Sequence, residues 1–170
     1  SGEIISIIPE PFSILSLPIP SDIKEPTLND CFDLYCKTEE LLGDNSIINE
    51  KTNEKEDVNK TIFFWDLPKI LIIDLKRWNE NGNKNNVFVN VDIKDVDLSK
   101  YVIGYNKLDN IYDLYGVCNH SGSSMGGHYT AHIKNSNNKW YEFNDTMITE
   151  IEENNIISEK SYCFFYRKKK

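Results

Sequence analysis

The segment 112–145 has the residue pattern of a small antiparallel sheet. Large apolar and polar residues alternate over 111–118 and again over 128–134, and a third run, 139–143, is rich in aromatic residues. Alternation of this kind is typical of strands that bury one face. We therefore predict a three-stranded meander, in which the small residues of 121–127 form the loop between the first two strands.

All three histidines of the chain, His120, His128 and His132, lie in this meander. His128 directly follows Gly126 and Gly127 at the start of the second predicted strand. A rigid strand end can hold an imidazole at the edge of a groove, and imidazole is the side chain best suited to take a proton from a nucleophile near neutral pH. His128 is therefore the candidate general base.

Asn144 and Asp145 end the third predicted strand. Either side chain can accept a hydrogen bond from one ring nitrogen of His128 and so fix its tautomer, which is the orienting role in a nucleophile, base and orienter set. The alternative is a half-buried strand histidine beside an ordinary turn, and the individual residues do not decide between the two.

The other two histidines are expected to be structural. A metal site built from the three histidines has no carboxylate or thiol to complete it, so we predict no metal. We expect His120 to make a hydrogen bond that orders the loop, and His132 either to face solvent or to pack. Tyr129 and Trp140 are expected to pack in the sheet.

Four motifs of this segment and the C-terminus, in this order, resemble the histidine box and closing strand of the ubiquitin-specific proteases, which are papain-like cysteine proteases. They are Gly-Val-Cys-Asn-His-Ser-Gly at 116–122, Gly-Gly-His-Tyr-Thr-Ala at 126–131, Trp-Tyr-Glu-Phe-Asn-Asp at 140–145 and Ser-Tyr-Cys-Phe-Phe-Tyr-Arg at 161–167. The similarity extends back through 67–78, 97–104 and 15–20, and so covers nearly the whole chain.

The resemblance implies an α+β fold that is mainly antiparallel β, equivalent to the palm and fingers of such a protease, with few short helices. It also implies hydrolysis of the isopeptide or peptide bond after the C-terminal Gly-Gly of ubiquitin, with ubiquitin or ubiquitin-conjugated proteins as partners and no cofactor. By this resemblance His128 corresponds to the general base and Asn144 to the third triad position, and Asp145 would support or replace Asn144.

The same resemblance assigns substrate contacts next to the base. Gly126 and Gly127 would border the channel for the narrow ubiquitin tail, because a Cβ there would obstruct it. Tyr129 is a further candidate contact for that tail. Two other functions remain open for the chain: a ubiquitin-binding module that does not cleave, or a scaffold for another partner.

Two family features are missing from the sequence. There is no cysteine box, so residues 3–170 are expected to be the C-terminal part of a catalytic domain, inactive without the upstream part that carries the nucleophile. The finger region contains none of the zinc-binding cysteines found in many members, which again predicts no metal. We expect a polar, flexible fingertip loop at about 43–58, and Ser1-Gly2 resembles a cloning remnant.

Composition limits the remaining choices. A 170-residue chain with 39% hydrophobic and 27% charged residues suits one globular domain, and a net charge of −8 argues against nucleic-acid binding. No apolar run is long enough to span a membrane. Cys31, Cys36, Cys118 and Cys163 show no CxxC spacing, so we expect reduced thiols in the cytoplasm or nucleus.

Local patterns predict the other elements. Thr27, with Asp30 three residues later, is a capping box that begins an amphipathic helix of about three turns. The remaining expectations are an edge strand at 12–17, strands at 61–65 and 69–78 with the second buried on both faces, a hairpin through Asn81-Gly82 into 87–91, a strand at 147–151, a helical turn at 152–157 and a closing strand at 162–167.

Overall fold

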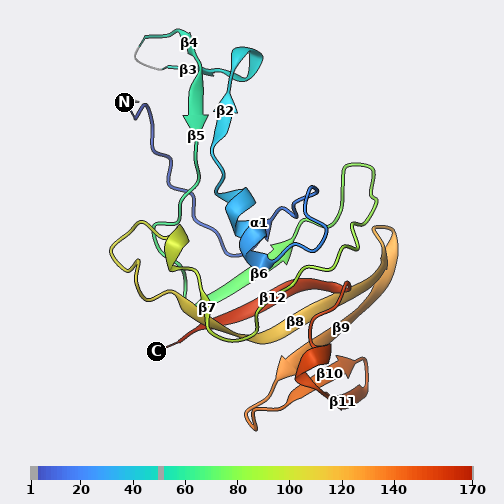
Figure 1. Cartoon of the computed structure of the whole chain (residues 1–170). Coiled ribbons are helices and arrows are strands. Elements are labelled where there is room, and N and C mark those ends of the chain that lie inside the picture. The colour runs from blue at the N-terminus through green and yellow to red at the C-terminus, as the bar shows by residue number, and fades with distance from the viewer. Residues whose placement is uncertain (1–3, 50–51, 170) are drawn as a thin grey trace.

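The protein is described by a computed structural model that covers residues 4–49 and 52–169 (Figure 1). Ser1-Gly2 lies outside the described residues. Most of the fold is one mainly antiparallel sheet in the strand order β1-β6-β12-β8-β9-β10-β11, with β7 paired to β8. Its strands are β1 (Leu15–Leu17), β6 (Ile70–Leu75), β7 (Val96–Asp97), β8 (Ile111–Ser123), β9 (Gly126–Lys134), β10 (Trp140–Asn144), β11 (Met147–Ile151) and β12 (Ser161–Lys168). The α+β class with few short helices is confirmed.

The predicted meander is β8, β9 and β10, paired antiparallel in sequence order. The predicted strand 147–151 follows as β11, and 3-10 turns cover Glu153–Asn155 and Ser99–Tyr101. The last strand does not close the sheet at an edge: β12 lies between β6 and β8 and pairs with both. The N-terminal strand is an edge strand, as expected, because β1 pairs only with β6 in the described sheet.

The helix α1 (Leu28–Tyr35) lies on one face of the sheet (Figure 1). Its capping box is confirmed: Thr27 Oγ1 accepts from the Asp30 amide, and the Asp30 carboxylate accepts from the Thr27 amide. The helix is shorter than predicted, since it ends after Tyr35. It buries Leu28, Cys31 and Phe32 in the core against the sheet face that carries Leu71, Ile73, Leu114, Phe164 and Tyr166.

A narrow arm projects away from the sheet (Figure 1). It consists of β2 (Glu39–Leu41) paired with β5 (Val58–Lys60), and β3 (Ile47–Ile48) paired with β4 (Lys55–Glu56), with a 3-10 turn at Gly43–Asn45. The expected fingertip loop 43–58 therefore contains a small hairpin; residues 50 and 51 lie outside the described part. Its flexibility stays a prediction.

Three local predictions are wrong. Residues 61–65 make only an isolated bridge, from Phe64 to Val102. Residues 87–91 form no hairpin strand, because their backbone turns to the start of α1, where the Leu28 amide donates to the Asn90 carbonyl at 2.9 Å. The strand β6 fully buries only one face, since Ile72 and Asp74 on the other face are half-buried.

Candidate functional site

The β8–β9 hairpin carries His128. Pairing continues to Ser123 and Gly126, with Ser121 opposite His128, so the predicted seven-residue loop is reduced to the two residues Ser124 and Met125. Because the hairpin is paired almost to its tip, His128 stands on a regular strand while its side chain remains exposed. The imidazole is thus accessible and held by a hydrogen-bonded ladder.

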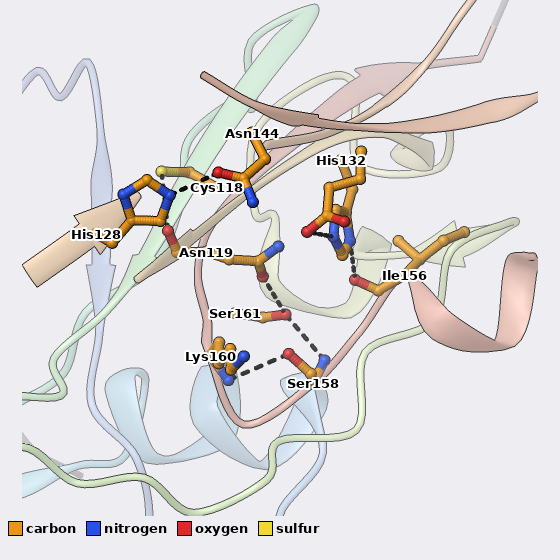
Figure 2. Close-up of polar contacts among 10 residues, drawn as sticks. Cys118, Asn119, His128, His132, Asn144, Ile156, Ser158, Lys160 and Ser161 are labelled. Atoms are coloured by element: carbon orange, nitrogen blue, oxygen red, sulfur yellow. Dashed lines mark hydrogen bonds and ion pairs between the residues drawn. The ribbon is translucent and has the colours of Figure 1, made fainter. Parts of the chain in front are cut away.

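The structure brings His128 and Asn144 together. Their side chains meet between β9 and the end of β10, with 2.7 Å between His128 Nε2 and Asn144 Oδ1 (Figure 2). An amide oxygen can only accept, so Nε2 carries the proton and donates it. The lone pair of Nδ1 is then available to a proton donor, which is the arrangement that a general base requires.

Asp145 occupies a different position. It follows Asn144 in the two-residue turn between β10 and β11, where Asn144 pairs with Met147. Its φ of 52° lies in the left-handed region, which tight hairpin turns require and which Asp tolerates better than most residues. Within the described residues Asp145 makes no hydrogen bond to His128. The tight turn therefore explains why an Asp occupies position 145. Its support of His128 in catalysis stays a prediction.

The two glycines before His128 have different surroundings. A Cβ on Gly126 would have no heavy atom within 4 Å, whereas a Cβ on Gly127 would lie 2.3 Å from Nε2 of His120 and 2.5 Å from the Ser121 carbonyl oxygen. Gly127 is therefore required by packing within the hairpin, and Gly126 borders open space. Tyr129 is 55% exposed, and its ring centroid lies 4.6 Å from that of His120.

His120 and His132 are both buried. The predicted hydrogen bond of His120 is confirmed, with Lys84 of a distant loop as the partner: 3.2 Å separate Lys84 Nζ from His120 Nδ1. Burial, and then the Lys84 charge, lower the pKa of His120. His132 packs and does not face solvent, since its Nδ1 donates to the Ile156 carbonyl at 2.8 Å (Figure 2).

A second polar chain lies beneath the site (Figure 2). Ser161 Oγ donates to Asn119 Oδ1 at 3.1 Å and accepts from the Ser158 amide at 3.0 Å. It ties β8 to the turn that precedes β12. Asn119, Ser161 and Lys84 were not predicted as site residues from the sequence. Asn119 and Ser161 lie inside the family motifs, and this position could have identified them. No sequence feature points to Lys84.

The four cysteines are free thiols, and burial raises the pKa of each. The values reach about 12 for Cys31 and Cys163 and about 11 for Cys36. A thiolate, not a thiol, is the nucleophile, so none of these cysteines has the electrostatic environment of an activated thiol.

Neither a metal cluster nor a membrane helix is found in the parts of the chain that the structure describes. Among residues 4–49 and 52–169 no group of three His, Cys, Asp or Glu side chains is arranged to hold a metal ion. None of the helices in the same residues is long and apolar enough to cross a membrane.

Comparison with known proteins identifies the family to which the chain belongs. The family model described as ubiquitin carboxyl-terminal hydrolase matches residues 23–166. The chain belongs to this family. The match includes His128, Asn144 and most of the sheet, so the ubiquitin-specific protease resemblance of the motifs is confirmed.

Curated relatives carry the same family name. The chain is 37% identical over 162 residues to ubiquitin carboxyl-terminal hydrolase 2 of Gallus gallus, covering 92% of this chain and 45% of that protein. It is 41% identical over 145 residues to ubiquitin carboxyl-terminal hydrolase 12 of Saccharomyces cerevisiae, covering 82% of this chain and 12% of that protein. The chain thus spans less than half the length of these relatives.

Solved structures of the family share the fold. A SAGA DUB module containing Ubp8, bound to monoubiquitin, matches with a TM-score of 0.80 and 31% identity over 95% of this chain and 36% of that one. The yeast SAGA DUB module in another structure matches with a TM-score of 0.78 and 30% identity, again over 95% of this chain and 36% of that one. The present chain therefore matches about a third of each of these longer chains.

Proposed function

We propose that this chain is the base-bearing part of a deubiquitinating thiol protease, which hydrolyses the isopeptide or peptide bond after the C-terminal Gly-Gly of ubiquitin. The observation that carries the proposal is the 2.7 Å contact of His128 with Asn144 on two paired strands, in a chain of the ubiquitin carboxyl-terminal hydrolase family. This contact supplies a base and its orienter, which is two-thirds of a papain-like triad.

The geometry supports a separate task for each ring nitrogen of His128. Nε2 donates to Asn144, which holds the ring in one tautomer and one orientation. Nδ1 would then take the proton of a cysteine thiol as the thiolate attacks the scissile carbonyl carbon. The protonated imidazole would return that proton to the leaving amine, and water would hydrolyse the resulting thioester. Asn144 is neutral, so it orients the imidazolium without neutralising its charge.

The nucleophile is proposed to come from an upstream part of the same catalytic domain. Burial raises the pKa of all four cysteines of this chain, which is opposite to the shift that an attacking thiol needs. The chain also spans only 36% of each matched SAGA module chain. By this proposal the 170-residue chain is inactive alone. Its free thiols suit a reducing compartment, the cytoplasm or nucleus.

Ubiquitin is the proposed partner because a structural neighbour is bound to monoubiquitin and because the motifs beside His128 match that family. Gly126 would border the channel for the ubiquitin tail, since open space surrounds the position of its missing Cβ. Exposed Tyr129 would contact the same tail. The net charge of −8 is compatible with a partner that carries a basic tail.

The test is intact-mass analysis after incubation with a ubiquitin probe that carries a thiol-reactive C-terminal group. The chain alone is expected to remain unmodified, and an adduct is expected on a cysteine of the upstream segment when both are present. A rapid adduct on one of the four cysteines of this chain would refute the missing-nucleophile assignment.

Variants of the complete protein separate the roles of the individual residues. We expect His128→Gln to abolish cleavage while ubiquitin binding is retained, and Asn144→Ala to lower kcat by more than Asp145→Asn, because only Asn144 contacts the ring. Unchanged cleavage by His128→Gln would reject the protease assignment. Binding without turnover in the complete wild-type protein would favour a ubiquitin-binding module.

A further inference from the structure

The loop 79–86, which follows β6, reaches across to the tip of the β8–β9 hairpin (Figure 1). Three hydrogen bonds between the described residues join them: Ser124 Oγ donates to the Gly82 carbonyl at 3.1 Å, and Lys84 Nζ donates to the His120 carbonyl and to His120 Nδ1. The proposed mechanism makes no use of this loop. It nevertheless touches the hairpin that carries the base.

Hydrogen bonds hold the loop at both ends, so it can act as a support. Its turn is closed by Asn79, whose side-chain oxygen accepts from the amides of Asn81 and Asn83 at 3.1 and 2.9 Å. Its far end is held by buried Arg77, whose Nη1 donates to the carbonyls of Asn85 and Val87 at 2.9 Å each. Lys84 lies between these two anchored parts of the loop, and its backbone forms an isolated antiparallel β-bridge with that of Trp78.

Lys84 is placed differently from the ion-paired lysines of the surface. Lys94, Lys100 and Lys139 each pair with a carboxylate and are more than half exposed. Lys84 is half-buried, burial lowers its pKa, and within the described residues no carboxylate lies at ion-pair distance from it. Its Nζ instead faces an imidazole nitrogen and a carbonyl and lies 5.6 Å from the centroid of the Trp78 ring. A partly desolvated ammonium in this setting is costly unless these contacts are made.

His120 in turn lies close to Gly127, the residue before the candidate base His128. The His120 ring contacts both Trp78 and Tyr129, at centroid distances of 5.3 and 4.6 Å. Its Nε2 edge is so close to Gly127 that a Cβ there would come within 2.3 Å. The His120 ring therefore packs closely against Gly127, which is bonded directly to His128.

We propose that Lys84 is a positioning residue for His128: its ammonium holds His120 in the neutral tautomer with the proton on Nε2, and the fixed ring sets the backbone at Gly127 and the direction of the His128 side chain. A protonated lysine can only donate, so His120 Nδ1 must be the acceptor. The catalytic part of this inference rests on the proposed function; the tautomer and backbone parts do not.

The first test is histidine ring ¹⁵N NMR of the chain, in which only three histidines contribute. We expect His120 Nδ1 to be unprotonated and Nε2 protonated in the wild-type chain. In Lys84→Met this preference is expected to be lost, and amide hydrogen exchange at Gly127 and His128 is expected to be at least about tenfold faster. Lys84→Arg keeps a hydrogen-bond donor at this position, so it should retain part of the tautomer preference of His120 and part of the slow amide exchange. The matched control, Lys94→Met, removes a surface lysine and should change neither.

A proton on His120 Nδ1 in the wild-type chain would overturn the proposal, even if no variant folded. Equal exchange rates at Gly127 and His128 in Lys84→Met and Lys94→Met would also overturn it. In the complete protein we expect Lys84→Met to lower kcat about tenfold or more with little change in KM, since misplacing a catalytic group slows chemistry without removing substrate contacts.

The two proposals fail separately. If His128→Gln does not reduce cleavage, the proposed function fails while the NMR results stand. If His128→Gln is inactive but Lys84→Met keeps the wild-type kcat, the protease assignment survives and the positioning role is rejected.

Discussion

Replacing Gly127 with alanine tests the packing of the hairpin, with the adjacent Gly126→Ala as its control. The new Cβ at 127 would lie 2.3 Å from His120 Nε2 and 2.5 Å from the Ser121 carbonyl oxygen, while the Cβ at 126 would meet nothing within 4 Å. The Ser121 atom belongs to the backbone of the paired strand β8, so a side-chain rotation cannot relieve the clash.

The close contacts at position 127 indicate how much stability Gly127→Ala should lose. Overpacking of this kind costs about 1–3 kcal/mol. Either substitution reduces the conformational freedom of the unfolded chain by a similar amount, so this term cancels between the two variants. We therefore expect Gly127→Ala to be less stable than Gly126→Ala by about 1–3 kcal/mol, and Gly126→Ala to stay within about 1 kcal/mol of the wild type.

Urea unfolding followed by tryptophan fluorescence measures the difference, since a pure stability change moves the midpoint and leaves the slope m unchanged. In a thermal melt the same difference corresponds to about 2–4 °C for each kcal/mol in a domain of this size. Equal midpoints for the two variants would refute the packing argument. A change in m for Gly127→Ala would mean that the substitution also alters how much structure unfolds.

Three further predictions follow from the fold and from the pKa shifts. Thr27→Ala removes the cap of α1 and is expected to cost about 1 kcal/mol in urea unfolding at neutral pH. The Thr27 hydrogen bonds to the Asp30 carboxylate hold its pKa below the usual 3.8, so their contribution is full above pH 3.8 and is lost as the pH falls through the lowered value. The bond from the Asp30 amide to Thr27 Oγ1 does not titrate, so the gap between wild type and Thr27→Ala should narrow in acid without closing; a constant gap would contradict this. Phe164→Ala, in the buried centre of β12, should cost about 3–5 kcal/mol, against less than about 0.5 kcal/mol for exposed Tyr105→Ala as control. Iodoacetamide near neutral pH should leave Cys31 unlabelled until the chain unfolds, because burial raises its pKa to about 12; labelling of native Cys31 would refute its burial.

Local signals predicted the elements whose pattern was complete within a short window. The capping box of Thr27 and Asp30 is such a signal, because both partners lie three residues apart. The strands β8, β9 and β10 were visible for the same reason, since alternation is a property of each strand alone. Residues 87–91 contain three valines and a phenylalanine, a composition that also favours a strand, yet they make their backbone bonds to the start of α1 and not to a hairpin partner. No local pattern encodes that choice.

The family, the mainly antiparallel fold and the candidate base His128 could all be predicted from the amino-acid sequence, because they depend on ordered motifs and on residue chemistry. The separate roles of Asn144 and Asp145 could not be predicted in this way: Asn144 meets His128 Nε2 and Asp145 forms the turn, because strand register and a left-handed φ separate the two adjacent residues. The tertiary structure alone also placed Lys84 on His120, 36 residues away in the chain. Such contacts arise where tertiary packing brings separate segments together, and the spacing of residues in the sequence does not predict them.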